Sequence, residues 1–84
     1  MNIAFSATGW ADYQYWAKTD KATLRRLNAL IKDCLRSPED GIGKPEALKH
    51  QLAGYWSRRI TDEHRLVYAV EEDQIVVIAA RHHY

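Results

Sequence analysis

The carboxyl-terminal residues of this chain have side chains that can carry or transfer a proton. An apolar run, IVVIAA, leads directly into Arg81, His82, His83 and Tyr84. Imidazole and phenol groups can act as general acids or bases, and a guanidinium binds anions. We therefore expect this end of the chain to form part of an active site whose other members come from elsewhere in the sequence.

Two of the possible chemistries have little support. A metal site could use some of the four histidines, but there is no HExxH motif and no paired cysteine, and adjacent histidines on a strand point to opposite sides. Covalent catalysis could use Cys34 or Ser57. However, Cys34 falls in the apolar stripe of an expected helix, and Ser57 lacks a Gly-x-Ser-x-Gly turn and a nearby acid.

Metal-independent cleavage of a phosphodiester uses the residue types that are present. RNA supplies its own nucleophile, the 2′-hydroxyl, so the protein needs a base, cations for the charge developing on phosphate, and an acid for the leaving 5′-oxygen. Arginine suits phosphate because its planar fork donates two parallel hydrogen bonds. Charged residues on strands more often form a solvated face, so the residue types alone leave both interpretations open. The candidates are Glu46, Lys49, Arg59, Arg65, His83 and Tyr84.

The spacing of apolar residues predicts the elements that would position these side chains. Residues 2–6 alternate as in a short strand, Thr8 and Gly9 interrupt the pattern, and an amphipathic helix follows from Trp10. Thr19 and Asp20 are typical N-cap residues for a second, longer helix, which should end at Ser37 because the residue before a proline is disfavoured in a helix. After a long loop at residues 37–54, three stretches have a period of two: YWSRRI, HRLVYAV and QIVVIAARHH.

This order predicts an α+β fold in which two antiparallel helices cover one face of an antiparallel sheet with a C-terminal three-stranded meander. Loops as long as residues 37–54 tend to be functional or mobile, and Glu46 and Lys49 would lie one turn apart if their part of it were helical. Strict alternation would place His83 and Tyr84 on opposite faces. Regular pairing should therefore end at about residue 82 if both serve one site.

Composition narrows the class of protein. A length of 84 residues with 46% hydrophobic content is typical of a single globular domain, here residues 1–84. Twelve Lys and Arg against eleven Asp and Glu exclude RNA binding by bulk charge, so RNA contact would need a local basic patch. The single cysteine allows no internal disulfide. The absence of a long apolar segment or secretory signal predicts a cytoplasmic protein without a membrane partner.

Long motifs add a family resemblance. The stretch GKPEALKHQLAGYWSRRITDEHRLVYAV, with AARHHY and the N-terminal WADYQYWAKTDK, resembles the YoeB group of bacterial toxins in the RelE/ParE superfamily. The resemblance covers nearly the whole chain and implies an α+β fold like that of small microbial ribonucleases. It also implies the toxin of a type II toxin–antitoxin system, which cuts messenger RNA in the ribosomal A site without a metal or cofactor and leaves a 2′,3′-cyclic phosphate.

The same resemblance implies partners and residue roles. The partners would be the bacterial ribosome with its A-site mRNA, a second copy of the chain in a homodimer, and a YefM-type antitoxin whose C-terminal segment displaces the toxin's terminal residues. A toxin that blocks the A site without cleaving, or one that inhibits a topoisomerase as ParE-like proteins do, is the alternative. By position, Glu46 matches the general base, His83 the general acid and Arg65 the transition-state cation, while Lys49, Arg59 and Tyr84 match residues that bind phosphate or orient the substrate.

Overall fold

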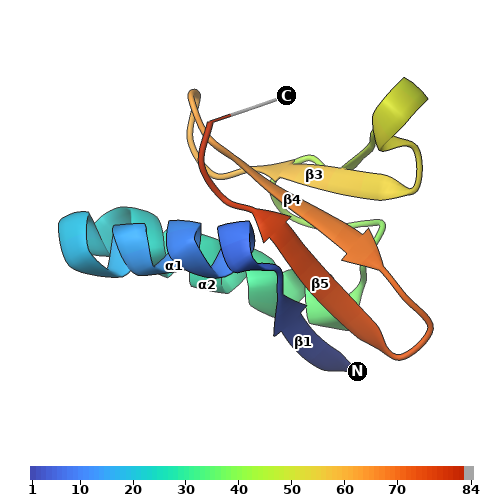
Figure 1. Cartoon of the computed structure of the whole chain (residues 1–84), viewed down its shortest axis with the longest axis horizontal. Helices are drawn as coiled ribbons and strands as arrows, with labels where there is room; N and C mark the ends of the chain where they lie inside the picture. Colours follow the sequence, from blue (N-terminus) through green and yellow to red (C-terminus); the bar gives the residue numbers. More distant parts are fainter. Residues whose placement is uncertain (83–84) are drawn as a thin grey trace.

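Two helices pack on one face of a five-stranded sheet (Figure 1). This computed structural model describes residues 1–82. The elements, in chain order, are β1 (Asn2–Phe5), α1 (Ala7–Thr19), α2 (Lys21–Arg36), β2 (Glu46–Ala47), the 3₁₀ turn η1 (His50–Leu52), β3 (Tyr55–Arg59), β4 (Arg65–Val70) and β5 (Gln74–Ala79). The predicted α+β layout, with both helices on one side of the sheet, is confirmed.

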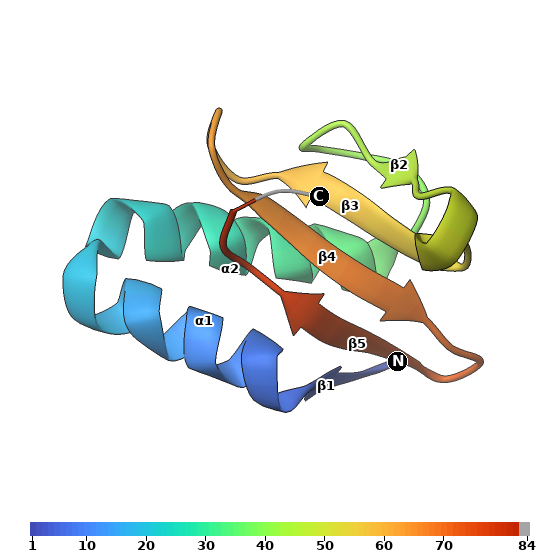
Figure 2. The same ribbon diagram turned by 45° about the horizontal axis from the view of Figure 1, so that its top comes forward.

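The sheet has the strand order β1-β5-β4-β3-β2, and β3, β4 and β5 form the predicted antiparallel meander (Figure 2). Two further pairings were not predicted. β1 lies parallel to β5 and joins the two ends of the chain, with Asn2 opposite Gln74. β2 lies within the segment predicted as a loop and pairs antiparallel with β3, which places Glu46 opposite Ser57. The first pairing joins opposite ends of the sequence, and β2 is only two residues long, so neither leaves a local pattern in the sequence.

The first helix begins at Ala7, so the prediction that it begins at Trp10 is wrong. Ser6 is the N-cap, and its hydroxyl accepts a hydrogen bond from the Gly9 amide at 3.0 Å. Gly9 does not interrupt the helix. It lies where α1 crosses β5, and a Cβ at this position would collide with the Val77 carbonyl oxygen. The glycine is therefore required by the close approach of the helix to the strand.

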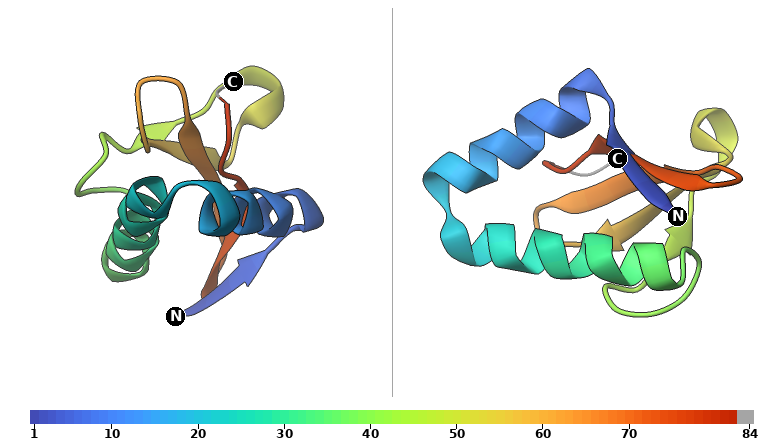
Figure 3. Two further views of the ribbon diagram at one scale, coloured as in Figure 1. Left: turned by 90° about the vertical axis from the view of Figure 1, so that its left-hand side faces the viewer. Right: turned by 90° about the horizontal axis from the view of Figure 1, so that it is seen from below.

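The second helix matches its prediction at both ends. The Asp20 carboxylate accepts from the Thr23 amide at 3.1 Å, and the helix ends at Arg36, with Ser37 as its C-cap. Figure 3 shows the two helices as an antiparallel hairpin against the sheet. The apolar stripe of α2 meets the inner sheet face in a core that contains Trp16, Leu27, Leu30, Cys34, Leu66, Tyr68, Ile75 and Val77. None of the helices within residues 1–82 is long and apolar enough to cross a membrane.

Regular pairing of the last strand ends at Ala79, earlier than the predicted limit near residue 82. The next residue bonds to α1 instead of a neighbouring strand. The Ala80 amide donates to the Asp12 carboxylate at 2.9 Å, and the Ala80 carbonyl accepts from the Trp16 indole at 2.8 Å. Helix α1 thus fixes the point at which the chain leaves the sheet.

Candidate active site

The predicted site residues from β2, β3 and β4 lie on the sheet face that the helices leave uncovered. Residues directly opposite each other in antiparallel strands share a face, and the register aligns Glu46 with Ser57 and Ser57 with Val67. Together with Leu48 and Arg65, these three residues line a pocket of about 60 Å³. This volume is far below the ~300–1,000 Å³ of pockets that enclose a drug-sized ligand. The pocket fits one small group of a substrate whose remainder is held elsewhere.

Arg65 is the cation of this pocket. It is partly buried, and its guanidinium donates a long hydrogen bond of 3.4 Å to the hydroxyl of Ser57, which is itself 1% exposed. Ser57 is thus buried beneath the arginine, consistent with a supporting role and not with that of a nucleophile. The backbone amide of Arg65 donates to the His82 carbonyl at 2.8 Å. Hydrogen bonds therefore hold both the side chain and the backbone of Arg65.

Glu46 supplies the carboxylate at the edge of the sheet. It is exposed, and among residues 1–82 its side chain has no hydrogen bond or ion pair, so its oxygens are available to a substrate. Its strand is only two residues long. Backbone hydrogen bonds on either side hold this strand: the Arg59 amide donates to Gly43 at 2.7 Å, and the Leu48 amide donates to Tyr55 at 2.9 Å.

Arg59 and Lys49 are both outside the lining of the pocket. Arg59 lies directly opposite Arg65 in the β3–β4 pair, so two guanidinium groups project from adjacent strands on the face that carries Glu46. Lys49 is exposed, precedes η1 and does not line the pocket. The condition for Glu46 and Lys49 to lie one helical turn apart is not met, because Glu46 belongs to a strand.

His83 and Tyr84 lie outside the described residues, so their predicted roles stay predictions. The residue before them is well anchored. The His82 amide donates to Nδ1 of His64 at 2.7 Å, and the His82 carbonyl accepts from the Arg65 amide. The chain leading to His83 is thus hydrogen-bonded to the start of β4, beside the pocket arginine.

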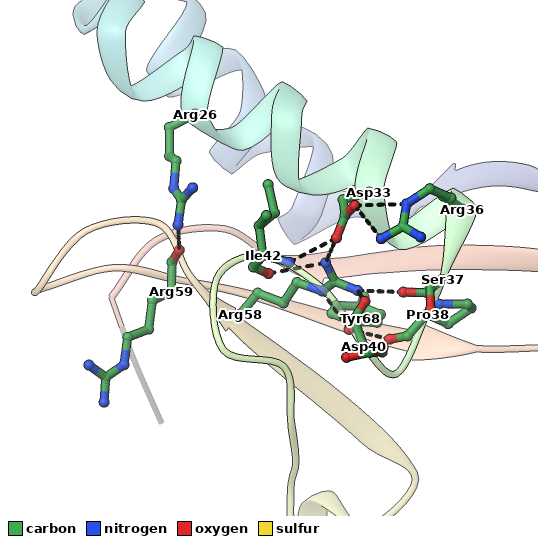
Figure 4. Close-up of polar contacts among 10 residues, drawn as sticks. All are labelled: Arg26, Asp33, Arg36, Ser37, Pro38, Asp40, Ile42, Arg58, Arg59 and Tyr68. Carbon is green, nitrogen blue, oxygen red and sulfur yellow. Dashed lines mark hydrogen bonds and ion pairs between the residues drawn. The ribbon is translucent and has the colours of Figure 1, made fainter.

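Arg58 is a polar residue of this region that was not predicted. It follows Ser57 on β3 and is fully buried. Figure 4 shows its side chain directed toward α2, whereas that of Arg59 points away from the helix. The signal in the sequence is alternation, because Arg58 shares the inner side of β3 with Trp56 and Ile60. Within residues 1–82, no three His, Cys, Asp or Glu side chains cluster as metal ligands would.

A helical hairpin on a small mixed sheet, with a carboxylate and two arginines on the open face, defines a toxin of the RelE-like fold. Among solved structures, a YoeB/ParE toxin from Agrobacterium tumefaciens has a TM-score of 0.97 and 45% identity over the whole of both chains. A YoeB dimer from Staphylococcus aureus has a TM-score of 0.93 and 45% identity, covering all of this chain and 98% of the other. A Helicobacter pylori toxin with 20% identity and a TM-score of 0.80 shares the fold.

The chain belongs to the YoeB-like toxins of bacterial type II toxin–antitoxin systems, whose family pattern matches residues 5–84. Its relatives include the toxin YoeB of Escherichia coli K12, 55% identical over the whole of both chains. The toxin YoeB of Streptomyces coelicolor is 54% identical, again over the whole of both chains. The predicted family and fold class are confirmed.

Proposed function

We propose that this toxin is a ribosome-dependent, metal-independent endoribonuclease that cuts messenger RNA in the ribosomal A site and so inhibits translation. The observation that carries the proposal is the pocket on the open sheet face, which Glu46 and Arg65 line together, with Arg59 opposite Arg65. A base and a phosphate-binding cation within one small pocket are what attack by a 2′-hydroxyl on its own phosphodiester requires.

The proposed reaction is a transesterification. Glu46 takes the proton of the 2′-hydroxyl as the 2′-oxygen bonds to phosphorus. Arg65, supported by Ser57, and Arg59 stabilise the negative charge that accumulates on the phosphate oxygens. The bond from phosphorus to the 5′-oxygen then breaks, and His83 donates a proton to that oxygen. The products are a 2′,3′-cyclic phosphate and a free 5′-hydroxyl.

Lys49 and Tyr84 complete the proposed site in supporting roles. Lys49, exposed just before η1, would contact the RNA backbone at a phosphate outside the pocket. Tyr84 would orient the substrate with His83. The family resemblance supports both assignments.

The small size of the pocket supports the proposed dependence on the ribosome. About 60 Å³ accommodates a single group of the substrate, and a net charge of +1 gives weak attraction for free RNA. The A site would hold the codon in line with the base and the cations. Positioning of this kind can supply about 7–11 kcal/mol of the activation barrier.

Two protein partners are proposed from relatives. YoeB of Staphylococcus aureus has been solved both as a heterotetrameric complex with YefM and as a dimer. In the complex, its YoeB chain has a TM-score of 0.92 and 45% identity to this chain. We propose that a YefM-type antitoxin neutralises this toxin, that the toxin forms a homodimer, and that it acts in the cytoplasm, where ribosomes are found.

The test is cleavage in a cell-free translation system, with mRNA ends mapped by primer extension. The wild type should produce new ends within translated codons, and Glu46→Gln should abolish them. Glu72→Gln is the matched control, since Glu72 is an exposed carboxylate in the turn between β4 and β5. Stalled ribosomes without new ends would instead support blocking of the A site. Normal translation accompanied by DNA damage would support inhibition of a topoisomerase.

A further inference from the structure

Arg58 is a fully buried charged residue that the proposed reaction does not use. Each of its five N–H groups has an acceptor (Figure 4). Nε donates to the Tyr68 hydroxyl at 3.0 Å, and one terminal nitrogen donates to Asp33 at 2.6 Å. The remaining acceptors are three backbone carbonyls, those of Ser37 at 2.6 Å, Asp40 at 3.0 Å and Ile42 at 3.1 Å.

All three carbonyls belong to segment 37–43, which forms most of the connection between α2 and the short strand β2. The two side chains that bond to Arg58, those of Tyr68 and Asp33, hold the same segment. The Tyr68 hydroxyl donates to the Pro38 carbonyl at 2.6 Å, and the Asp33 carboxylate accepts from the Ile42 amide at 2.9 Å. Burial raises the pKa of Tyr68, so its hydroxyl keeps the proton that it donates. Segment 37–43 is therefore wrapped around one guanidinium group.

This segment leads into the strand that carries Glu46. At its end, Gly43 accepts a hydrogen bond from the Arg59 amide, and Glu46 follows three residues later. Gly43 has φ +79, and a Cβ there would crowd Leu30 and the Cβ of Arg58. A two-residue edge strand has little pairing of its own, so its position depends on the residues that flank it, and segment 37–43 supplies those on the N-terminal side.

We propose that Arg58 is a positioning residue for catalysis: by holding segment 37–43, it places the Glu46 carboxylate beside Arg65. This inference rests on the proposed nuclease function and deepens it. The side chain of Arg58 is on the inner face of β3, toward α2. Glu46 is on the neighbouring strand β2, opposite Ser57, whose side chain is on the outer face. Arg58 therefore acts through the backbone and not by touching the substrate.

The ion pair between Arg58 and Asp33 allows a variant that separates an effect on the position of Glu46 from an effect on the stability of the fold. Replacing a buried ion pair by neutral side chains of similar volume often leaves stability unchanged, because the cost of desolvating the charges disappears with them. An apolar side chain at position 58 can fill the space below α2, but it cannot donate to the three carbonyls. These belong to partly or fully exposed residues, unlike the buried Ala80, so water can replace the lost donor. The variant Arg58→Met with Asp33→Asn removes both charges and keeps an acceptor for the Ile42 amide.

The experiment measures mRNA cleavage on programmed ribosomes with toxin in saturating excess, so that the rate constant does not depend on the fraction of toxin that is folded. We expect the double variant to have the circular dichroism of the wild type and to bind ribosomes equally well. Its cleavage rate constant should fall on the order of 100-fold, the effect of displacing a catalytic group by about 1 Å. Limited proteolysis should cut segment 37–43 faster than in the wild type.

Two further variants keep the inference falsifiable. Leu27→Ala destabilises the core from the same helix and leaves every hydrogen bond to segment 37–43 in place, so its rate constant should match that of the wild type. Tyr68→Phe removes the hydroxyl that bonds both Arg58 and Pro38, and it should lower the rate constant to an intermediate value. If the double variant does not fold, Tyr68→Phe decides the question.

The outcomes separate the inference from the proposed function. Cleavage by the double variant, or by Tyr68→Phe, at the wild-type rate constant would overturn the positioning role. An equal fall in Leu27→Ala would also overturn it, because the effect would then come from stability alone. Failure of the wild type to cleave, or full activity of Glu46→Gln, would instead refute the nuclease function.

Discussion

Replacing Trp16 by phenylalanine tests how α1 holds the end of β5. The Trp16 indole donates to the Ala80 carbonyl at 2.8 Å, and Ala80 is fully buried while Trp16 is 6% exposed. Phenylalanine keeps an aromatic ring in the core but removes the N–H group. The buried carbonyl would then lose its donor, and the smaller ring would leave a gap beside it.

The magnitude follows from these two losses. A buried carbonyl without a partner costs about 1–3 kcal/mol, and the gap left by the smaller ring adds about 1 kcal/mol. The free energy of unfolding should therefore fall by about 2–4 kcal/mol. For a chain of this size, that loss lowers the Tm by roughly 10–25 °C.

Trp10→Phe is the matched control on the same helix. Trp10 is 50% exposed, and among residues 1–82 its indole N–H has no hydrogen-bond partner, so the change should cost less than about 0.5 kcal/mol. Urea unfolding should be followed by far-ultraviolet circular dichroism, because tryptophan fluorescence would change with the substitutions themselves. Equal stability losses in the two variants, or an unchanged Trp16→Phe, would refute the proposed anchoring.

Three further predictions concern stability and reactivity. The hydrogen bond from the Ile42 amide, aided by Arg58, lowers the pKa of Asp33 from 3.8 to about 2. Its contribution to stability is therefore complete above pH 3.8 and is lost as the pH falls through 2, and acid titration of unfolding should show this loss in the wild type but not in Asp33→Asn. Gly9→Ala should reduce the free energy of unfolding by about 1–3 kcal/mol in urea, because the added Cβ collides with the Val77 carbonyl. A gain in stability, as helix propensity alone would give, would contradict this packing. Burial raises the pKa of the Cys34 thiol, so a thiol reagent should modify it only as fast as the protein unfolds. Rapid reaction under native conditions would count against its burial.

Much of the fold could be predicted because some signals are local. The caps and the apolar stripe of α2 are encoded within a few residues, and so is the period of two in the meander strands. The start of α1 was predicted too late: Ser6 is a typical N-cap, but Gly9 has the local appearance of a helix breaker. Its place in the helix follows from contact with β5, a strand at the other end of the sequence.

The candidate site shows the same division. The identities of Glu46, Arg59 and Arg65 follow from the motifs that resemble the YoeB group. Their proximity does not, because β2 is two residues long and shows no periodicity. Alternation along β3 separates Arg58 from Arg59, but only the packing of α2 and segment 37–43 reveals that Arg58 has five partners.

The sequence by itself determined the family, the helical hairpin, the meander and the set of side chains available for chemistry. The tertiary structure decided which arginine is buried and which faces the pocket, where the last strand ends, and that Glu46 and Arg65 share one pocket. The physical reason is that periodicity and capping depend on near neighbours in the chain. Burial and strand pairing depend on segments that meet only after folding.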